Sequence, residues 1–126
     1  MREVGSPDGA RAALAGRLRR GESIPGFGHL LYPHGDPRSR ALLELTAAAY
    51  PSAPVVTLAG AVSREMKRVT GELPNVDLAL VVLARTLDLP AGGAIALFAL
   101  GRTIGWIGQA IEQYRLDKII RPRARY

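Results

Sequence analysis

The stretch from Gly92 to Ile111 places the strongest constraint on how this chain can fold. Arg102 is its only charged residue, and the rest is apolar or small on nearly every side of a helix. A helix on the surface of a globular protein shows a single apolar stripe, so a helix of this kind has to be covered all round. Five helices in a free-standing domain could hardly enclose it. We therefore expect it to pack against a partner, either a second copy of the chain or sequence outside it.

The same stretch is long enough to cross a bilayer, but its composition favours a buried helix of a soluble protein. Burying Arg102 at the middle of a membrane would cost roughly 3 kcal/mol. The five glycines between residues 92 and 111 lower the hydrophobicity further. The first ten residues carry charges of both signs and no apolar run, unlike a secretory signal. We expect no membrane association and a cytoplasmic location.

Proline and glycine divide the chain into five helical segments. Ser6-Pro7-Asp8, Asp36-Pro37 and Asn75 are helix starts, and Gly71 is a helix stop. The valine pairs at 55–56 and 81–82 do not alternate with polar residues, so they are interpreted as helical. The sequence predicts an all-α fold with helices at about 6–21, 36–51, 54–71, 75–89 and 91–114.

Composition excludes several classes of function. The 126 residues, which are one domain or a piece of a larger one, include no cysteine and only 2 histidines. Thiolate chemistry is therefore absent, and a metal site would depend on carboxylates. Aromatic residues make up only 6%, which argues against base stacking, whereas the net charge of +6 favours an anionic partner. The basic tail at 115–126 is either a solvated end or a nucleic-acid arm, and it carries no recognition motif.

The loop at 24–38 holds the densest cluster of unusual residues. Gly26 and Gly28 permit positive φ and close backbone approach, and they present His29 at the tip. Histidine there is either a general acid or hydrogen-bond donor, or a turn residue that bonds its own backbone. A metal pair with His34 would lack further ligands at a suitable spacing.

Two further residues could carry chemistry. Asp77, two residues after Asn75, either complements the helix dipole or, if partly buried, acts as a general base. Arg102 needs an anion because an unpaired buried charge is costly, and that anion is either a protein carboxylate or a substrate carboxylate. The sequence leaves both questions open.

Taken together, four pieces of the chain resemble the C-terminal part of the citrate synthase family. They are Pro-Gly-Phe-Gly-His at 25–29, Asp-Pro-Arg at 36–38, Pro-Asn-Val-Asp at 74–77, and Gly-Arg-Thr-Ile-Gly-Trp at 101–106 followed by Arg-Pro-Arg at 121–123. Their order and spacing agree with that family from about Asp8 onward.

The resemblance implies the condensation of acetyl-CoA, or another acyl-CoA, with an oxaloacetate-like keto acid. Asp77 would remove a proton from the thioester methyl group, and His29 would donate to the ketone oxygen. By the same resemblance, Arg38, Arg102 and Arg121 would grip the keto acid, with Arg121 reaching from a second subunit. Guanidinium forks suit this role because they bind carboxylates bidentately.

The resemblance also implies how the co-substrate is bound. Gly26, Phe27 and Gly28 would contact the coenzyme A thioester, which is a co-substrate, so no tightly bound cofactor is implied. Many relatives place basic residues after the loop histidine to bind the CoA phosphates, whereas this chain has Leu30 and Pro33. This difference bears on CoA affinity and on the choice of acyl group.

The family architecture implies three regions. Residues 1–89 resemble the small, mobile domain, residues 90–114 a large-domain helix at the dimer interface, and residues 115–126 an arm that crosses to the partner. The family's other catalytic histidine lies upstream of the matched motifs. We therefore expect the chain to be inactive alone and to work as a homodimer or with a separate N-terminal half. The alternatives are a non-catalytic keto-acid or CoA-binding or regulatory module with the same fold, and a basic helical nucleic-acid-binding module.

Overall fold

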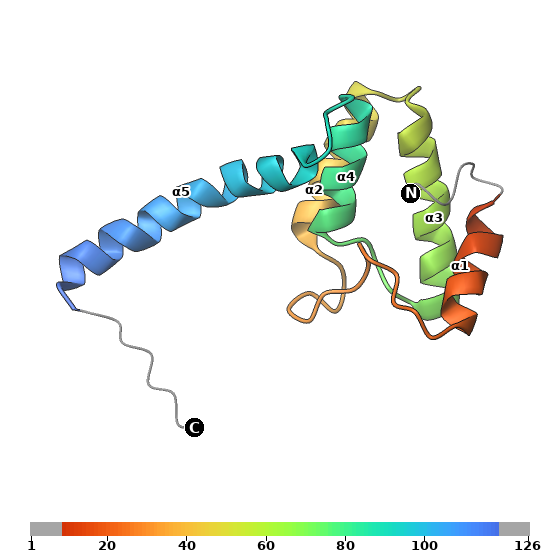
Figure 1. Ribbon diagram of the computed structural model, residues 1–126, viewed down its shortest axis with the longest axis horizontal. Helices are drawn as coiled ribbons and strands as arrows, with labels where there is room; N and C mark the ends of the chain where they lie inside the picture. Colours follow the sequence, from red (N-terminus) through yellow and green to blue (C-terminus); the bar gives the residue numbers. More distant parts are fainter. Residues whose placement is uncertain (1–8, 119–126) are drawn as a thin grey trace. The chain divides into compact units, whose positions relative to one another are not determined.

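The computed structural model describes residues 9–118 and confirms the all-α fold. Its helices are α1 (Ala10–Arg19), α2 (Pro37–Ala49), α3 (Pro54–Thr70), α4 (Val76–Thr86) and α5 (Gly93–Leu116) (Figure 1). Within the described residues, β structure is limited to an isolated bridge between Phe27 and Pro74. The chain divides into two compact units, Met1–Ala94 and Ile95–Tyr126.

Local sequence signals explain where the helices of the first unit begin and end. The Asp36 side chain caps α2, and Pro37 is its first residue. Gly71 ends α3 with a left-handed φ of 76°, a conformation that glycine adopts without strain. The Asn75 side chain accepts a hydrogen bond from the amide of Asp77 and so caps α4. These boundaries agree closely with the sequence-based prediction, while the start signal at 6–8 lies outside the described residues.

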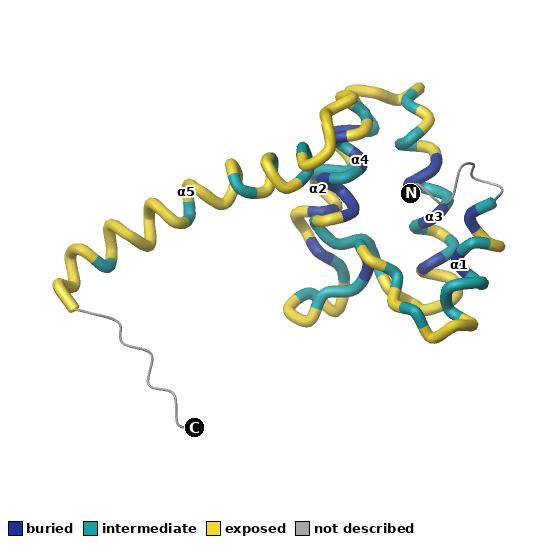
Figure 2. The backbone as a smooth tube through the Cα atoms, viewed as in Figure 1, coloured by how far each residue is buried: buried dark blue, intermediate teal, exposed yellow. Residues whose placement is uncertain are grey.

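The core of the first unit lies where α1, α3 and α4 meet. α4 packs against α2 and α3, and α1 packs against α3. Figure 2 shows the buried segments on the facing sides of these helices. Met66 of α3 and Val82 of α4 are fully buried. The other members of the buried cluster are Ala10, Leu14, Phe27, Leu58, Ala59, Val62 and Leu78.

α5 differs from the other helices because none of its 24 residues is buried. Large apolar side chains on it are exposed, among them Ile95, Ile104 and Trp106. By length and composition α5 could also cross a membrane, a test that core helices of soluble proteins pass as well. The partner expected to cover this helix therefore stays a prediction.

Candidate active site

Two motifs almost fifty residues apart are joined by backbone hydrogen bonds. The amide of Gly28 donates to the carbonyl of Leu73 at 2.9 Å, and the amide of Asn75 donates to the carbonyl of Gly26 at 2.9 Å. The side-chain amide of Asn75 adds a bond from Nδ2 to the carbonyl of Gly28 at 3.0 Å. This pairing fixes the base of the loop that carries His29 beside the start of α4.

The glycines of this loop are required by its close packing. Gly26 has a φ of +92°, and a Cβ added there would lie 3.1 Å from Cβ of Leu78 on α4. Gly28 has a φ of +73°, and its added Cβ would lie 3.2 Å from Oε1 of Glu72. The side chain of Phe27, between them, is buried in the core. A ligand at this loop can therefore meet the backbone of Phe27 but not its ring.

The Asp36 carboxylate joins the N-termini of α2 and α4. Its side chain is fully buried. It accepts hydrogen bonds from Nε, Nη2 and the backbone amide of Arg38 at 2.9, 2.9 and 3.0 Å. A fourth bond, at 3.0 Å, comes from the amide of Val76. The Arg38 guanidinium is the main reason that the pKa of Asp36 falls to about 2, while burial opposes the shift and the two backbone amides add to it.

Arg38 is held on two sides and still reaches solvent. One edge of its guanidinium forms the fork with Asp36, and its Cζ lies 5.3 Å from the centroid of the Tyr32 ring, within cation–π range. About half of its side chain is exposed. The pKa of Arg38 is raised, mainly by its hydrogen bonds to Asp36 and with a contribution from the charge of Asp77. The arginine thus presents fixed donors at the surface.

His29 contacts this guanidinium. Its Nδ1 accepts a hydrogen bond from the backbone amide of Leu31 at 3.1 Å. Its Nε2 lies 3.4 Å from Nη2 of Arg38, and the tautomer of the ring decides whether Nε2 accepts from the guanidinium or carries the ring proton. An oxygen atom placed between the two side chains could accept from the guanidinium and from a protonated Nε2.

Asp77 lies in a different groove from His29. It is exposed in the first turn of α4. It borders a groove of about 450 Å³ together with Gly26, Arg85 and residues 89–94. His29 borders a cavity of about 300 Å³ with Tyr32 and residues 70–74. The structure therefore brings His29 and Arg38 into contact, and it places Asp77 near enough for its charge to act on Arg38 but in a neighbouring groove.

The other two arginines belong to the second part of the chain. Arg102 is exposed on α5, where its Nη2 donates to Oε1 of Gln109 at 3.4 Å. A Cβ added at Gly105 would lie 3.2 Å from Nη1 of Arg102, so this glycine leaves room for the guanidinium. Arg121 lies outside the described residues. Between residues 9 and 118, no group of His, Asp and Glu could hold a metal ion.

Sequence reasoning missed the residues that position the others. From the sequence, Asp36 is a helix start and part of the Asp-Pro-Arg motif without a role of its own, although its place two residues before Arg38 allows the fork that is observed. Tyr32 belongs to none of the four sequence motifs, yet its ring lies 4.8 Å from that of His29, centroid to centroid, and the Arg38 guanidinium lies over its face. Nothing local in the sequence could have indicated the bond from Asn75 to Gly28.

Comparisons with known proteins all find citrate synthases or 2-methylcitrate synthases. The family model described as "Citrate synthase, C-terminal domain" matches residues 1–123. Citrate synthase 2 of Bacillus subtilis is 32% identical over 100% of this chain and 35% of its own length. The 2-methylcitrate synthase of Mycobacterium tuberculosis (strain Erdman) is 31% identical over 100% of this chain and 33% of its own length.

The fold comparison agrees with the sequence comparison. The crystal structure of citrate synthase from Thermotoga maritima superposes with a TM-score of 0.83 at 31% identity, covering 99% of this chain and 36% of that one. The chain spans about a third of the length of the relatives that it matches.

Proposed function

Because the chain belongs to the citrate synthase family, we propose that it forms the C-terminal part of an enzyme that condenses an acyl-CoA with oxaloacetate or a similar keto acid. Its relatives include a citrate synthase and a 2-methylcitrate synthase, which supports either acetyl-CoA or propionyl-CoA as the acyl donor. Coenzyme A enters as a thioester co-substrate, so the proposal includes no tightly bound cofactor.

The contact between His29 Nε2 and the Arg38 guanidinium is the observation that carries this proposal. The ketone oxygen of the keto acid gains negative charge as the new carbon–carbon bond forms, and fixed donors stabilise that charge. In our proposal the Nε2 proton of His29 passes to this oxygen, which becomes the hydroxyl of the product. Arg38 holds an adjacent carboxylate of the keto acid, and its clamp by Asp36 keeps the guanidinium in one orientation.

Asp77 is the proposed base that removes a proton from the methyl or methylene group of the thioester. The resulting enolate carbon then attacks the ketone carbon, and water hydrolyses the thioester of the condensed product to a carboxylate, which releases CoA as the free thiol. So weak a carbon acid reacts only when base and substrate are aligned and water is excluded. Asp77 is exposed in the described residues, so further protein has to close the site before the reaction can proceed.

Further residues of the proposed site belong to both parts of the chain. The backbone of residues 26–28 is suited to approach CoA, because both glycines have positive φ and carry no side chain. Arg102 and Arg121 would supply two more guanidinium groups to the keto acid, Arg121 from a second subunit. The proposed partner is a second copy or a separate N-terminal half, and the proposed location is the cytoplasm.

The resemblance implies a second catalytic histidine beside His29 and Asp77, and it has no match here, because His34 is the only other histidine of this sequence and lies outside the matched motifs. We therefore expect no measurable release of CoA thiol from the isolated chain with acetyl-CoA or propionyl-CoA and oxaloacetate. Addition of a polypeptide with the N-terminal two thirds of a citrate synthase is expected to restore release. Turnover by the chain alone at about 1–1000 per second would contradict the proposal.

The keto-acid site can also be tested without turnover. Titration of the chain with oxaloacetate is expected to shift the ring resonances of His29, and R38A is expected to weaken this binding at least tenfold. The control is R64A on the exposed side of α3, which should bind as the unmodified chain does. Equal affinity in R38A and R64A would refute the assigned site. Binding without turnover in the completed protein would instead support a non-catalytic keto-acid module.

A further inference from the structure

The groove that Asp77 borders continues along α4 beyond the residues assigned to the reaction. It has a volume of about 450 Å³, and its whole lining belongs to the first unit of the chain. Asp77, Val81 and Arg85 follow one another at intervals of four residues, which places them on one face of α4, and all three line the groove. The groove therefore runs from the proposed base at the start of α4 to an arginine in its last turn.

The middle of this groove is apolar, and the wall beside it is made of small residues. Leu78, Val81 and Ala84 form the part contributed by α4. The 89–94 segment forms another wall, and a Cβ added at Gly92 would meet nothing within 4 Å. Backbone without side chains can come close to a ligand and can pair with its amide groups. This part of the groove suits a narrow chain of methylene and amide groups.

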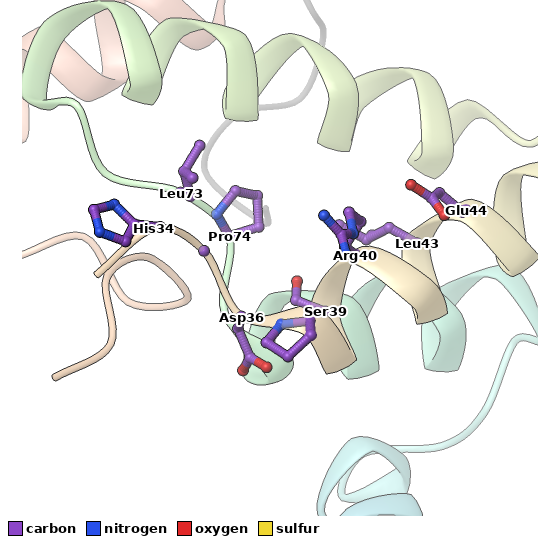
Figure 3. A pocket seen from close by; sticks show the side chains of 10 residues that line it. His34, Asp36, Ser39, Arg40, Leu43, Glu44, Leu73 and Pro74 are labelled. Atoms are coloured by element: carbon purple, nitrogen blue, oxygen red, sulfur yellow. The ribbon is translucent and has the colours of Figure 1, made fainter. Parts of the chain in front are cut away.

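Arg85 supplies a positive charge at the far end of the groove. It is exposed, and within residues 9–118 no carboxylate forms an ion pair with it. A separate cavity of about 330 Å³ at Ser39, beside α2 (Figure 3), is bordered by Arg40 and also by Glu44, one helical turn away, so charges of both signs border it. The Arg85 guanidinium is instead available to an anion, and phosphate suits it because a guanidinium binds phosphate bidentately.

The length of the groove determines which molecule could use both of its ends. Asp77 and Arg85 are separated by eight residues of helix, which rise by about 12 Å, and the long Arg85 side chain extends this span. An acyl-CoA has its acyl group at one end of a pantetheine arm and a diphosphate at the other. The arm consists of methylene and amide groups, so it matches the middle of the groove, while its two ends match the base and the arginine.

We propose that the pantetheine arm of the acyl-CoA lies in this groove and that Arg85 binds the diphosphate at its end. The inference rests on the proposed function, because it takes Asp77 as the base that meets the acyl group. It adds Arg85 as a substrate-binding residue and places the acyl donor along α4, away from the keto acid at His29 and Arg38.

Pantetheine and phosphopantetheine are suitable probes because they differ only in a phosphate. Titration of the chain with either is expected to give saturable shifts of the Leu78 and Val81 methyl resonances, and phosphopantetheine should bind about tenfold more tightly. R85A is expected to abolish this difference by weakening phosphopantetheine binding alone. Arg85 is exposed and alanine favours a helix, so the variant should fold. R64A also removes one exposed arginine charge, from α3, and as the control it should keep the difference.

Three results would overturn the inference. Equal affinity of the unmodified chain for the two probes would mean that no cation meets the phosphate. An equal loss in R85A and R64A would mean that only the overall charge matters. The absence of saturable shifts at Leu78 and Val81 up to millimolar concentrations would mean that the acyl donor does not lie along α4. In each case a retained shift of His29 with oxaloacetate would leave the proposed keto-acid site standing, which distinguishes the two failures.

Discussion

At the scale of single residues, the Asp36 carboxylate has the most connections in the proposed site. It accepts four hydrogen bonds, three from Arg38 and one from the amide of Val76. Both amides belong to the first turns of helices, where a negative charge is favourable. One buried charge therefore orients the arginine and also holds two helix starts together. Changes at this residue should affect stability and ligand binding alike.

The lowered pKa of Asp36 predicts a definite dependence of stability on pH. The pKa falls from 3.8 to about 2 on folding, so the folded state favours the charged form. The stabilisation is complete above about pH 5 and is lost progressively as the pH falls from about 5 through the folded-state pKa of about 2. Since Arg38 is half exposed, solvent screening reduces the stabilisation from Asp36 to about 1–2 kcal/mol. Urea unfolding at a series of pH values between 2 and 7 measures this contribution.

Asp36→Asn separates this effect from general acid unfolding. We expect D36N to lower the free energy of unfolding at pH 7 by about 1–2 kcal/mol and to flatten the profile between about pH 5 and 2. E44Q, on the exposed side of the same helix, is the control and should keep the profile of the unmodified chain. An unchanged profile in D36N would show that Asp36 is not the titrating group.

Tyr32 offers a test of how Arg38 is oriented. The ring lies under the guanidinium at 5.3 Å, an interaction of about 0.5–1 kcal/mol at a partly exposed site. We expect Y32L to weaken oxaloacetate binding by about two- to fivefold, because the arginine loses one of its two supports. Y32F keeps the ring and should bind normally. Equal losses in both variants would point to the phenol hydroxyl rather than to the ring.

At the scale of elements, the sequence allowed helix boundaries to be predicted but not the contacts between helices. The caps at Asp36, Gly71 and Asn75 involve residues within one helical turn of each. Such local signals can be recognised in the sequence. The bond from Asp36 to Val76 spans 40 residues, and the cavity at Ser39 depends on how α2 meets the 73–74 segment. Such features follow from tertiary packing, which no local pattern encodes.

Asn75 connects one element to another through two different bonds. Its Oδ1 accepts from the amide of Asp77, and its Nδ2 donates to the carbonyl of Gly28. We expect N75A to lower the free energy of unfolding by about 1–2 kcal/mol, since both bonds are lost. N75D keeps the cap but cannot donate, so its loss should be smaller. Denaturant titration compares the two: no loss in N75D would mean that the bond to Gly28 contributes nothing, and an equal loss in both variants would mean that the cap contributes nothing.

At the scale of the whole molecule, α5 determines whether the chain can exist alone. Its 24 residues include none that is buried, and the exposed side chains include Ile95, Phe98, Leu100, Ile104 and Trp106. Apolar surface of this extent on a monomer marks an interaction site. An apolar helix without a covering partner is also a poor candidate for a stable element, because packing supplies most helical stability. Association should therefore be measurable for the chain itself.

We expect the chain to sediment as a species heavier than its monomer mass of 13.5 kDa, with α5 protected from hydrogen exchange. Ile104, 78% exposed, is a suitable site for disruption. I104D places a charge in the apolar surface and should weaken association at least tenfold, because burying an unpaired carboxylate is costly. I104L keeps the apolar area and should associate normally. A monomer whose α5 is helical and protected would contradict this expectation, because the helix would then be stable without the partner that its apolar surface requires.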